Sequence, residues 1–595
     1  MVKHWRFAAI TAFVVLLLTG LLAADLFNRG LVWQFFWSQT GEEQPLAQVR
    51  GMVEWVGNLT RSQPINDPLI PVDHANVNPY GINTFLHQEV DPAKVDEQLR
   101  LIADAGFGWI REEFTWEEIE VDGRGQFTDS RNDMDGDGTR DTISGWAKFD
   151  RIVDLAEKHG IRIQARLSNP PAWSQSEGVH TQTPPANTQD YVNFITAAAE
   201  RYRGRVTHFQ IWNEPNIFPE WGADGPEETP RPVNPEAYTA LLCASYEALK
   251  AVDPDIVVIS GALAPTSELG TRNLNDFVFL ERMYEAGAGQ CFDVLSMQGY
   301  GLNSGPTDRR MRSTNVNFGR SQYIRDLMVK KGDSSKPIWI SEAAWNPVPT
   351  ESDYPEPISN RYIFGQVTLT QAAQYMPMAY QRMEHEWPWV AVMNYWYFTQ
   401  PSDLNKGSSW YYFRMAEPDY SDQHPTYTTL PIYASMKAYI QQNAPTLYQG
   451  VHQLDGHWAV AVDNAAEAVK IEGAQFDEAL QASSLDFVYS GTDLLLRWRG
   501  GRVSVSIDGG EPFIVETEAG QWQTTPVFET VQSGVRNVSL TSVDGSPFVI
   551  DAAVVMDQPF RKLLPLWAGL AASGTVVVTV LLTIAHQRNN KKALP

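Results

Sequence analysis

The sequence predicts an α/β protein with a central (β/α)8 (TIM) barrel, followed by an all-β sandwich and flanked by an apolar, transmembrane-type helix at each end. Three observations support this fold class. Short apolar runs and amphipathic segments alternate eight times within residues 78–445, which is typical of parallel strands covered by helices. Short alternating strands follow in residues 446–560. Long apolar runs lie near both ends of the chain.

The barrel elements follow one another in regular order. The expected strands are continuous apolar runs, as in sheets buried on both faces, and Gly106 and Gly160 end the first two helices. We expect strands at residues 80–86, 109–116, 161–167, 206–212, 255–262, 292–298, 337–341 and 390–397. We expect helices at residues 91–105, 149–159, 188–202, 235–251, 275–286, 322–331, within 360–385, and at 432–442.

The part after the barrel has the texture of an all-β domain. Glycine and aspartate clusters separate short runs of alternating residues, which predicts turns between strands. The expected strands are residues 457–462, 487–489, 493–498, 503–507, 512–516, 537–541 and 548–555.

The two ends of the chain carry membrane signals. Residues 7–24 are almost purely apolar after Lys3 and Arg6, and residues 563–585 form a second apolar run before a basic tail. We expect both termini in the cytoplasm and residues 27–560 outside the cell, in the cell membrane. A cleaved signal peptide is the alternative for the N-terminus, and a buried core helix for the second run. The expected segments are a signal anchor (1–26), a juxtamembrane linker (27–77), a transmembrane helix (563–585) and a cytoplasmic tail (586–595).

Composition excludes some classes of function. The chain has 46 basic and 71 acidic side chains, a formal net charge of −25, so we expect no nucleic-acid partner. Cys243 and Cys291 are the only cysteines, which excludes a disulfide-rich scaffold. Two unpaired buried thiols are expected, although the pair could form a disulfide in an oxidising compartment.

Two carboxylates stand at predicted strand ends. Glu214 follows the fourth strand in the motif Trp-Asn-Glu-Pro-Asn, where Pro215 ends the strand, and Glu342 closes the seventh strand. Reactive groups of such barrels gather at the C-terminal ends of the strands. Strands four and seven face each other across a barrel, so both carboxylates can reach its axis. A carboxylate pair of this kind is what glycosidic bond cleavage requires.

These motifs resemble those of the clan A retaining glycoside hydrolases, most closely in the neighbourhood of families 39 and 5. The resemblance spans residues 78–445. It implies that Glu214 is the acid/base and Glu342 the nucleophile of a double displacement, with no cofactor for catalysis. The β-sandwich likewise resembles the jelly-roll modules often attached to carbohydrate-active enzymes, with possible carbohydrate binding.

The resemblance also implies substrate-binding residues. Asn213 should contact the sugar 2-hydroxyl, Arg111 and Tyr300 should support the nucleophile, and Trp396 should form the platform under the sugar. A surface ion pair of Arg111 with Glu112 or Glu113, and a core role for Trp396, are the alternatives. Gln298 departs from the family pattern, because many relatives carry histidine there, and Trp345 flanks the nucleophile. Trp173 and Trp116 either wall the cleft or belong to the core.

An acidic cluster lies between the second strand and its helix. Asp133, Asp135 and Asp137 followed by Gly138 match the start of a calcium loop, with Asp141 as a further ligand. Ser144 stands where a full loop of this type has glutamate. We therefore expect a structural Ca²⁺ site or, alternatively, a solvated acidic loop.

The function expected from these features is a membrane-anchored extracellular glycosidase acting on oligosaccharides, polysaccharides or glycoconjugates. A catalytically weak carbohydrate-binding or adhesion protein and a transglycosylase of cell-surface glycans are the alternatives. Gln298 and the residues around Glu342, which would help to select the sugar, depart from the family pattern.

Overall fold

The computed structural model describes residues 2–133, 138–175, 182–218, 220–221, 232–420, 426–518 and 520–559. The chain divides into two compact units, Met1–Ala444 and Pro445–Pro595, each of which is described by itself.

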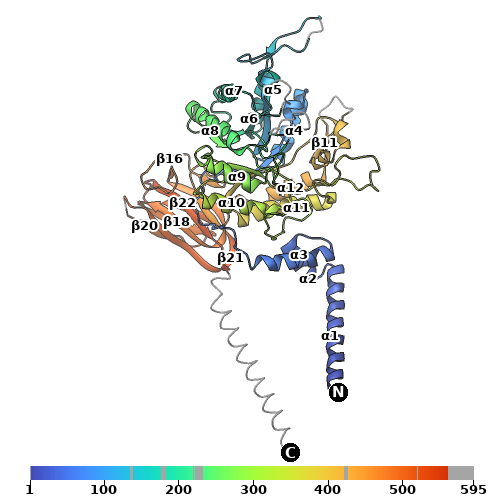
Figure 1. Ribbon diagram of the computed structural model, residues 1–595. Coiled ribbons are helices and arrows are strands. Elements are labelled where there is room, and N and C mark those ends of the chain that lie inside the picture. Colours follow the sequence, from blue (N-terminus) through green and yellow to red (C-terminus); the bar gives the residue numbers. More distant parts are fainter. Residues whose placement is uncertain are drawn as a thin grey trace, which may run out of the picture. The chain divides into compact units, whose positions relative to one another are not determined.

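The first unit contains an eight-stranded parallel sheet (Figure 1). Its order is β7-β6-β5-β2-β1-β10-β9-β8, and isolated parallel bridges between Ile259 and Val294 and between Leu263 and Met297 join the two outer strands. The sheet therefore closes into a barrel. Its strands are β1 (Tyr80–Asn83), β2 (Trp109–Thr115), β5 (Arg162–Ser168), β6 (His208–Ile211), β7 (Val257–Ile259), β8 (Leu295–Gln298), β9 (Ile338–Ala343) and β10 (Val390–Tyr395).

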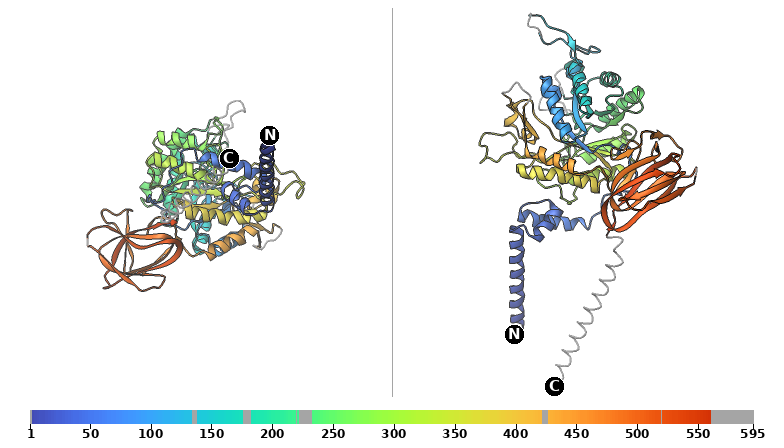
Figure 2. Two further views of the ribbon diagram at one scale, coloured as in Figure 1. Left: turned by 90° about the horizontal axis from the view of Figure 1, so that it is seen from below. Right: turned by 180° about the vertical axis from the view of Figure 1, so that it is seen from behind.

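Helices follow the strands and surround the sheet (Figure 2). Asp91, Asn187, Asn234 and Asn275 cap the N-termini of four of them through their side chains. The helices are α4 (Pro92–Asp104), α6 (Ala147–Lys158), α7 (Thr188–Arg201), α8 (Pro235–Val252), α9 (Asp276–Glu285), α10 (Ser321–Lys330), α11 (Leu369–Glu386) and α12 (Pro431–Gln442). The predicted alternation of eight strands and eight helices is thus confirmed.

Short elements decorate the loops of the barrel. They are α5 (Trp116–Ile119), the pairs β3 (Thr128–Asp129) with β4 (Ile143–Ser144) and β11 (Ala416–Pro418) with β12 (Tyr427–Thr429), and the 3-10 turns η1 (Leu86–Gln88), η2 (Ala172–Ser174), η3 (Ala288–Gln290), η4 (Phe318–Arg320), η5 (Asp403–Gly407) and η6 (Ser409–Phe413).

The barrel interior changes from apolar to polar along its length. Trp109, Trp339, Val257 and Val294 form a buried layer near the start of the strands. Beyond it, Gln164, Gln210, Ser296, Ser341 and Asn394 are fully buried and hydrogen-bonded to one another. This polar layer lies directly beneath the side chains at the C-terminal ends of the strands.

The N-terminal segment is more structured than the predicted linker. It contains α1 (Val2–Phe27), α2 (Leu31–Thr40) and α3 (Pro45–Asn58). Gly305 N donates to Gly41 O at 2.8 Å, and Arg310 pairs with Glu42 at 2.8 Å. The α2–α3 pair is therefore bonded to the loop after β8.

The apolar N-terminal run lies in α1, and a bend separates α1 from α2. No single helix among the described residues is both long enough and apolar enough to cross a bilayer. Thr11–Phe27 and Leu31–Thr40 pass together, as a pair bent by 67°. The second predicted span, residues 563–585, lies outside the described residues.

A disulfide joins Cys243 of α8 to Cys291, with a Cα–Cα distance of 4.6 Å. The prediction of two unpaired thiols is therefore wrong. Their separation of 48 residues conceals the pairing, because α8, β7 and α9 lie between them in the chain.

The second unit is a sandwich-like arrangement of mostly antiparallel strands. Its main path runs β16-β17-β22-β18-β21-β19-β20 and encloses an apolar core with Leu485, Leu496, Trp498, Leu540 and Ile550. The strands are β13 (Thr446–Leu447), β14 (Gly450–Gln453), β15 (Val460–Val462), β16 (Glu467–Val469), β17 (Ala479–Ala482), β18 (Ser484–Arg499), β19 (Gly501–Ile507), β20 (Phe513–Thr517), β21 (Gln523–Ser542) and β22 (Phe548–Met556).

Two strand predictions of this unit need correction. The expected strands 487–489 and 493–498 are one strand, β18, whose register shifts between Gly491 and Asp493. The glycine and aspartate that suggested a turn form a bulge instead. The expected strand 537–541 is the end of the much longer β21, whose first half is largely polar and gave no strand signal.

Candidate active site

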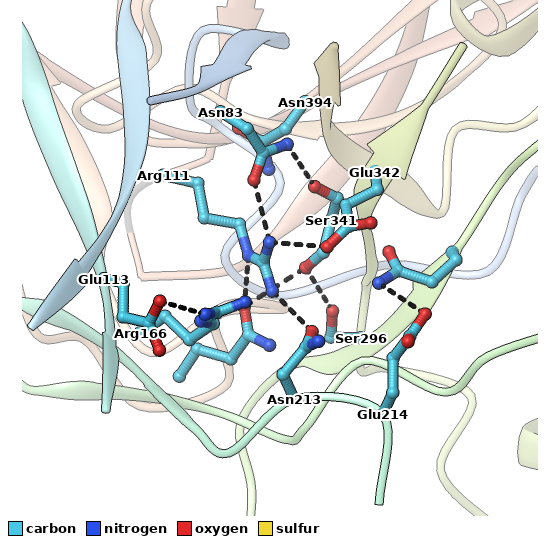
Figure 3. Close-up of polar contacts among 12 residues, drawn as sticks. Asn83, Arg111, Glu113, Arg166, Asn213, Glu214, Ser296, Ser341, Glu342 and Asn394 are labelled. Carbon is cyan, nitrogen blue, oxygen red and sulfur yellow. Dashed lines mark hydrogen bonds and ion pairs between the residues drawn. The ribbon is translucent and has the colours of Figure 1, made fainter. Parts of the chain in front are cut away.

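Glu214 and Glu342 lie at the C-terminal end of the barrel (Figure 3). Glu342 belongs to β9, and Glu214 follows β6. Asn213 forms a bridge with Ala262, and Glu214 N donates to Ala262 O at 2.9 Å. The backbone beyond β6 is thereby fixed to the strand beside it. Glu214 has a φ of +39°, which is strained for a residue other than glycine. Residues with such strained backbone angles cluster at functional sites.

The rest of the Trp-Asn-Glu-Pro-Asn motif supports this backbone. A Cβ on Gly261 would lie 2.9 Å from Ile211 O and 3.2 Å from Pro215 Cδ, so only glycine fits beside the turn. Asn216 is fully buried, donates to Ala264 O at 2.8 Å and accepts from Ala264 N at 2.8 Å. The sequence predicted no role for Asn216. In the structure, its side chain holds the backbone of the neighbouring loop at Ala264.

Both carboxylate oxygens of Glu342 accept hydrogen bonds. Arg111 Nη1 donates to Oε1 at 2.9 Å, and the Tyr300 hydroxyl donates to Oε2 at 2.7 Å. Burial, and then the charge of Glu342, raises the pKa of Tyr300 well above its usual value, so its proton stays on the hydroxyl. The two donors fix the orientation of the carboxylate.

Arg111 itself is held on every side. Its guanidinium donates to Asn83 Oδ1 at 2.7 Å, Gln210 Oε1 at 2.8 Å and Asn213 Oδ1 at 2.8 Å. Arg111 is 3% exposed, so the alternative of a surface ion pair is excluded. Burial lowers the pKa of Arg111, and the charge of Glu342 opposes this effect.

Glu214 has a different environment. Gln298 Nε2 donates to its Oε1 at 3.2 Å. Burial, followed by the negative charges of Glu342 and Glu220, raises the pKa of Glu214 well above its usual value. Glu342 is thus paired with a cation, the Arg111 guanidinium, whereas the raised pKa of Glu214 favours its protonated form. That contrast is typical of an acid and its partner carboxylate.

Glu220 is a third carboxyl group near the pair, and sequence reasoning missed it. Burial raises its pKa to about 7, although the nearby Arg166 opposes this shift, and the Asn213 side chain hydrogen-bonds to it. Its only signal in the sequence is its place six residues after Glu214.

A small pocket of about 10 Å³ is lined in part by Arg111. Asn83, Thr84, Phe85, Glu113, Arg166 and Trp396 complete its lining. Glu113 and Arg166 form an ion pair in it. Burial raises the pKa of Glu113, but the Arg166 charge outweighs this effect and brings it down to about 2. The pocket therefore presents a charged pair and an aromatic wall.

Comparison with known proteins gives one sequence match. Residues 72–273 match the family model "Cellulase (glycosyl hydrolase family 5)". The barrel is that of a glycosidase. The match covers β1 to β7 and includes Glu214, so the resemblance to the clan A glycoside hydrolases is confirmed. No curated protein sequence matches this glycosidase.

Several solved structures resemble the glycosidase. A family 39 glycoside hydrolase from Bacteroides cellulosilyticus WH2 is 16% identical, with 78% of this chain and 80% of that chain covered and a TM-score of 0.43. A glucosidase from Croceicoccus marinus is 14% identical (81% and 97% covered, TM-score 0.42). A monomeric beta-xylosidase from Caulobacter crescentus CB15 is 14% identical (81% and 98% covered, TM-score 0.40).

The four tryptophans predicted near the cleft divide into two groups. Trp396 is partly exposed and lines the pocket, with its ring edge-on to Phe85. Trp173 is partly exposed, donates to Glu120 O at 2.8 Å and packs edge-on against Trp116.

The other two tryptophans belong to the core. Trp116 is fully buried and stacks on Phe194 of α7, so it does not wall a cleft. Trp345 is 1% exposed, donates to Ser304 O and packs against Gly301, where a Cβ would lie 2.1 Å from its ring. These contacts place the Trp345 ring in the core, which corrects its expected substrate contact.

Part of the predicted calcium loop, including Asp135 and Asp137, lies outside the described residues. Asp133 accepts a hydrogen bond from Gly138 N at 2.8 Å, and Asp141 N donates to Asn132 O at 2.9 Å. Among the residues that the structure describes, no group of three or more metal-binding side chains is found.

Proposed function

We propose that this glycosidase cleaves O-glycosidic bonds with retention of configuration, with Glu342 as nucleophile and Glu214 as acid/base. The observation that carries the proposal is the contrast between the two carboxyl groups. Arg111 and Tyr300 hold both oxygens of Glu342, whereas the pKa of Glu214 is raised by burial and by Glu342. A nucleophile must be ionised and oriented, and an acid must hold a proton at the start of the reaction.

The first step forms a glycosyl-enzyme. Glu342 attacks the anomeric carbon while Glu214 gives its proton to the leaving oxygen, and the C–O bond to the leaving group breaks. Attack uses an electron pair of the carboxylate, and the departing oxygen takes the pair of the broken bond. Tyr300 and Arg111 lose hydrogen-bonding strength to Glu342 as it becomes an ester, so their support is greatest before attack.

The second step releases the sugar. Glu214, now a carboxylate, takes a proton from water, and the water oxygen attacks the anomeric carbon and displaces Glu342. Esterification removes the charge of Glu342, which is one cause of the raised pKa of Glu214. The pKa of Glu214 therefore falls when it has to act as a base.

Other residues would bind the sugar. Asn213 bonds to Arg111 and Glu220 and would contact the 2-hydroxyl, while Trp396 would stack against the sugar ring. Gln298 would help to position Glu214 through its 3.2 Å hydrogen bond. Oligosaccharides, polysaccharides and glycoconjugates are the proposed substrates.

We also propose that the glycosidase is anchored in the cell membrane with its barrel outside the cell. The apolar runs at residues 7–24 and 563–585, together with the basic residues beside them, support this anchoring. The bent pair Thr11–Phe27 and Leu31–Thr40 supports it by length and composition.

The catalytic proposal can be tested by assaying a panel of aryl glycosides and identifying the first sugar anomer released by proton NMR. We expect the released anomer to have the configuration of the substrate, and Glu214→Gln and Glu342→Gln each to abolish most of the activity. Glu236→Gln, which changes only an exposed ion pair with Arg282, is the matched control and should keep full activity. Release of the opposite anomer, or parental rates in both site variants, contradicts the proposal.

A further inference from the structure

Helix α3 is amphipathic, but its polar face is buried and its apolar face is exposed. Its buried residues are Gln48, Gly51 and Asn58, which face the protein. A stripe at spacings of three and four faces outward and is apolar: Leu46 (84% exposed), Val49 (43%), Val53 (72%) and Val56 (53%). A surface helix of a globular protein shows the opposite arrangement, with its apolar stripe inward.

Specific contacts fix this orientation of α3. Gln48 Nε2 donates to Glu42 O at 2.9 Å. A Cβ on Gly51 would lie 2.9 Å from the Thr40 side chain, so this glycine allows α3 to approach α2 closely. Glu54 pairs with Arg310 of the barrel loop at 3.6 Å. A rotation that buried the apolar stripe would break all three contacts.

Helix α2 extends the exposed apolar surface. Leu31 is 80% exposed and Phe35 is 51% exposed, and Phe35 contacts Trp55 of α3 edge-on. Trp33 is buried, and Trp37 stacks on Trp33 and packs against Tyr375 of α11. Trp33 and Trp37 of α2 therefore pack against the protein, whereas Phe35 is exposed to the surroundings.

Helix α1, which directly precedes α2 in the chain (Figure 1), also carries exposed apolar side chains. Phe13, Leu16, Leu21 and Phe27 of α1 are 66%, 72%, 60% and 78% exposed. The bend of 67° between α1 and α2 turns the chain from the direction of α1 into that of α2. A spanning helix followed by helices that lie along the bilayer surface would have this geometry.

We propose that α2 and α3 lie in the interfacial layer of a lipid bilayer, with Leu31, Phe35, Leu46, Val49, Val53 and Val56 among the acyl chains. This rests on the proposed membrane anchoring and adds that the barrel is held at a fixed height through the bonds of α2–α3 to residues 305–312. Contiguous apolar surface of this kind is rare on monomeric proteins unless a partner covers it, and interfacial helices bury such a face at the boundary between the headgroups and the acyl chains.

A fluorescent probe on α3 tests the proposal in the full chain. Both native cysteines are disulfide-bonded, so Val53→Cys gives one reactive thiol for an environment-sensitive dye. In phosphatidylcholine vesicles we expect the emission to shift to the blue and most of it to be lost with brominated acyl chains. Gln189→Cys, exposed on α7, is the matched control and should show neither effect. Glycosidase activity of both labelled variants reports that they are folded.

The outcomes separate this inference from the anchoring itself. A chain that floats with the vesicles but whose Val53 dye is not quenched contradicts the interfacial helices and leaves the anchoring intact. A chain that does not float contradicts both. A blue shift without quenching, accompanied by a dimer in detergent, shows that a second copy of the chain covers the stripe, and this also overturns the proposal.

Discussion

The Tyr300 hydroxyl donates a 2.7 Å hydrogen bond to Oε2 of Glu342, while Arg111 occupies the other oxygen. Tyr300 follows β8 and Glu342 belongs to β9, so the bond joins neighbouring strand ends of the barrel. Because both oxygens are held, the carboxylate has a single orientation. The proposed chemistry depends on this orientation, so the loss of either donor should slow the reaction.

Tyr300→Phe removes one hydrogen bond and keeps the ring. A hydrogen bond to a charged group contributes about 1.5–3 kcal/mol, so we expect kcat/KM to fall by about 10-fold to 100-fold. The melting temperature should change little. Tyr246→Phe, which removes a hydroxyl that bonds to Asp293 away from the site, is the control. Equal rates for both variants contradict the role of Tyr300.

Arg111→Gln leaves Glu342 without its cation. Breaking a buried ion pair costs about 3–5 kcal/mol, so we expect kcat/KM to fall by at least about 100-fold and the melting temperature to drop. Arg111→Lys keeps the charge but loses most of the bonds to Asn83, Gln210 and Asn213, so it should be intermediate. Parental kcat/KM in Arg111→Gln would rule out the proposed support.

The pH dependence of kcat/KM reports on Glu214. Its raised pKa means that the acid is protonated at low pH, and activity is lost as pH rises through that pKa. The Gln298 hydrogen bond lowers this pKa. Gln298→Leu should therefore move the basic limb of the profile to higher pH. A limb that stays in place or moves to lower pH contradicts the assignment of Glu214 as the acid.

The Cys243–Cys291 disulfide closes a loop of 48 residues. The chain-entropy relation gives about 4 kcal/mol for a loop of this length. We expect a reducing agent to lower the melting temperature of the parent protein, and the double variant Cys243→Ser/Cys291→Ser to melt at the lower temperature with or without reductant. If the parent and the double variant melt together under oxidising conditions, the disulfide does not stabilise the protein.

Most of the barrel could be predicted from sequence because each strand and helix has a local signal. The predicted strand of residues 109–116 and the observed β2 (Trp109–Thr115) agree almost residue for residue. Glu214 and Glu342 could be found because a strand end is itself a local feature. The resemblance then supplied Arg111 and Tyr300, whose contacts with Glu342 the structure contains.

What the sequence could not provide depends on contacts between distant segments. Asn83 and Glu220 become parts of the site only through Arg111, Arg166 and Asn213. In the sequence, Trp345 resembles a cleft residue because it stands close to Glu342. In the structure its ring lies in the core, in the space that the missing side chain of Gly301 leaves. The exposed stripe of α3 is an ordinary amphipathic pattern in sequence, and only the structure shows which face is outward.

The assignment of the two carboxylates is tested most directly by rescue with azide. In Glu342→Ala, azide should attack the anomeric carbon in place of the nucleophile and yield a glycosyl azide of inverted configuration. In Glu214→Ala with an activated aryl glycoside, azide should attack the glycosyl-enzyme and yield the azide of retained configuration. NMR of the two products distinguishes these results. The opposite configurations, or no azide product from either variant, would contradict the assigned roles of Glu342 and Glu214.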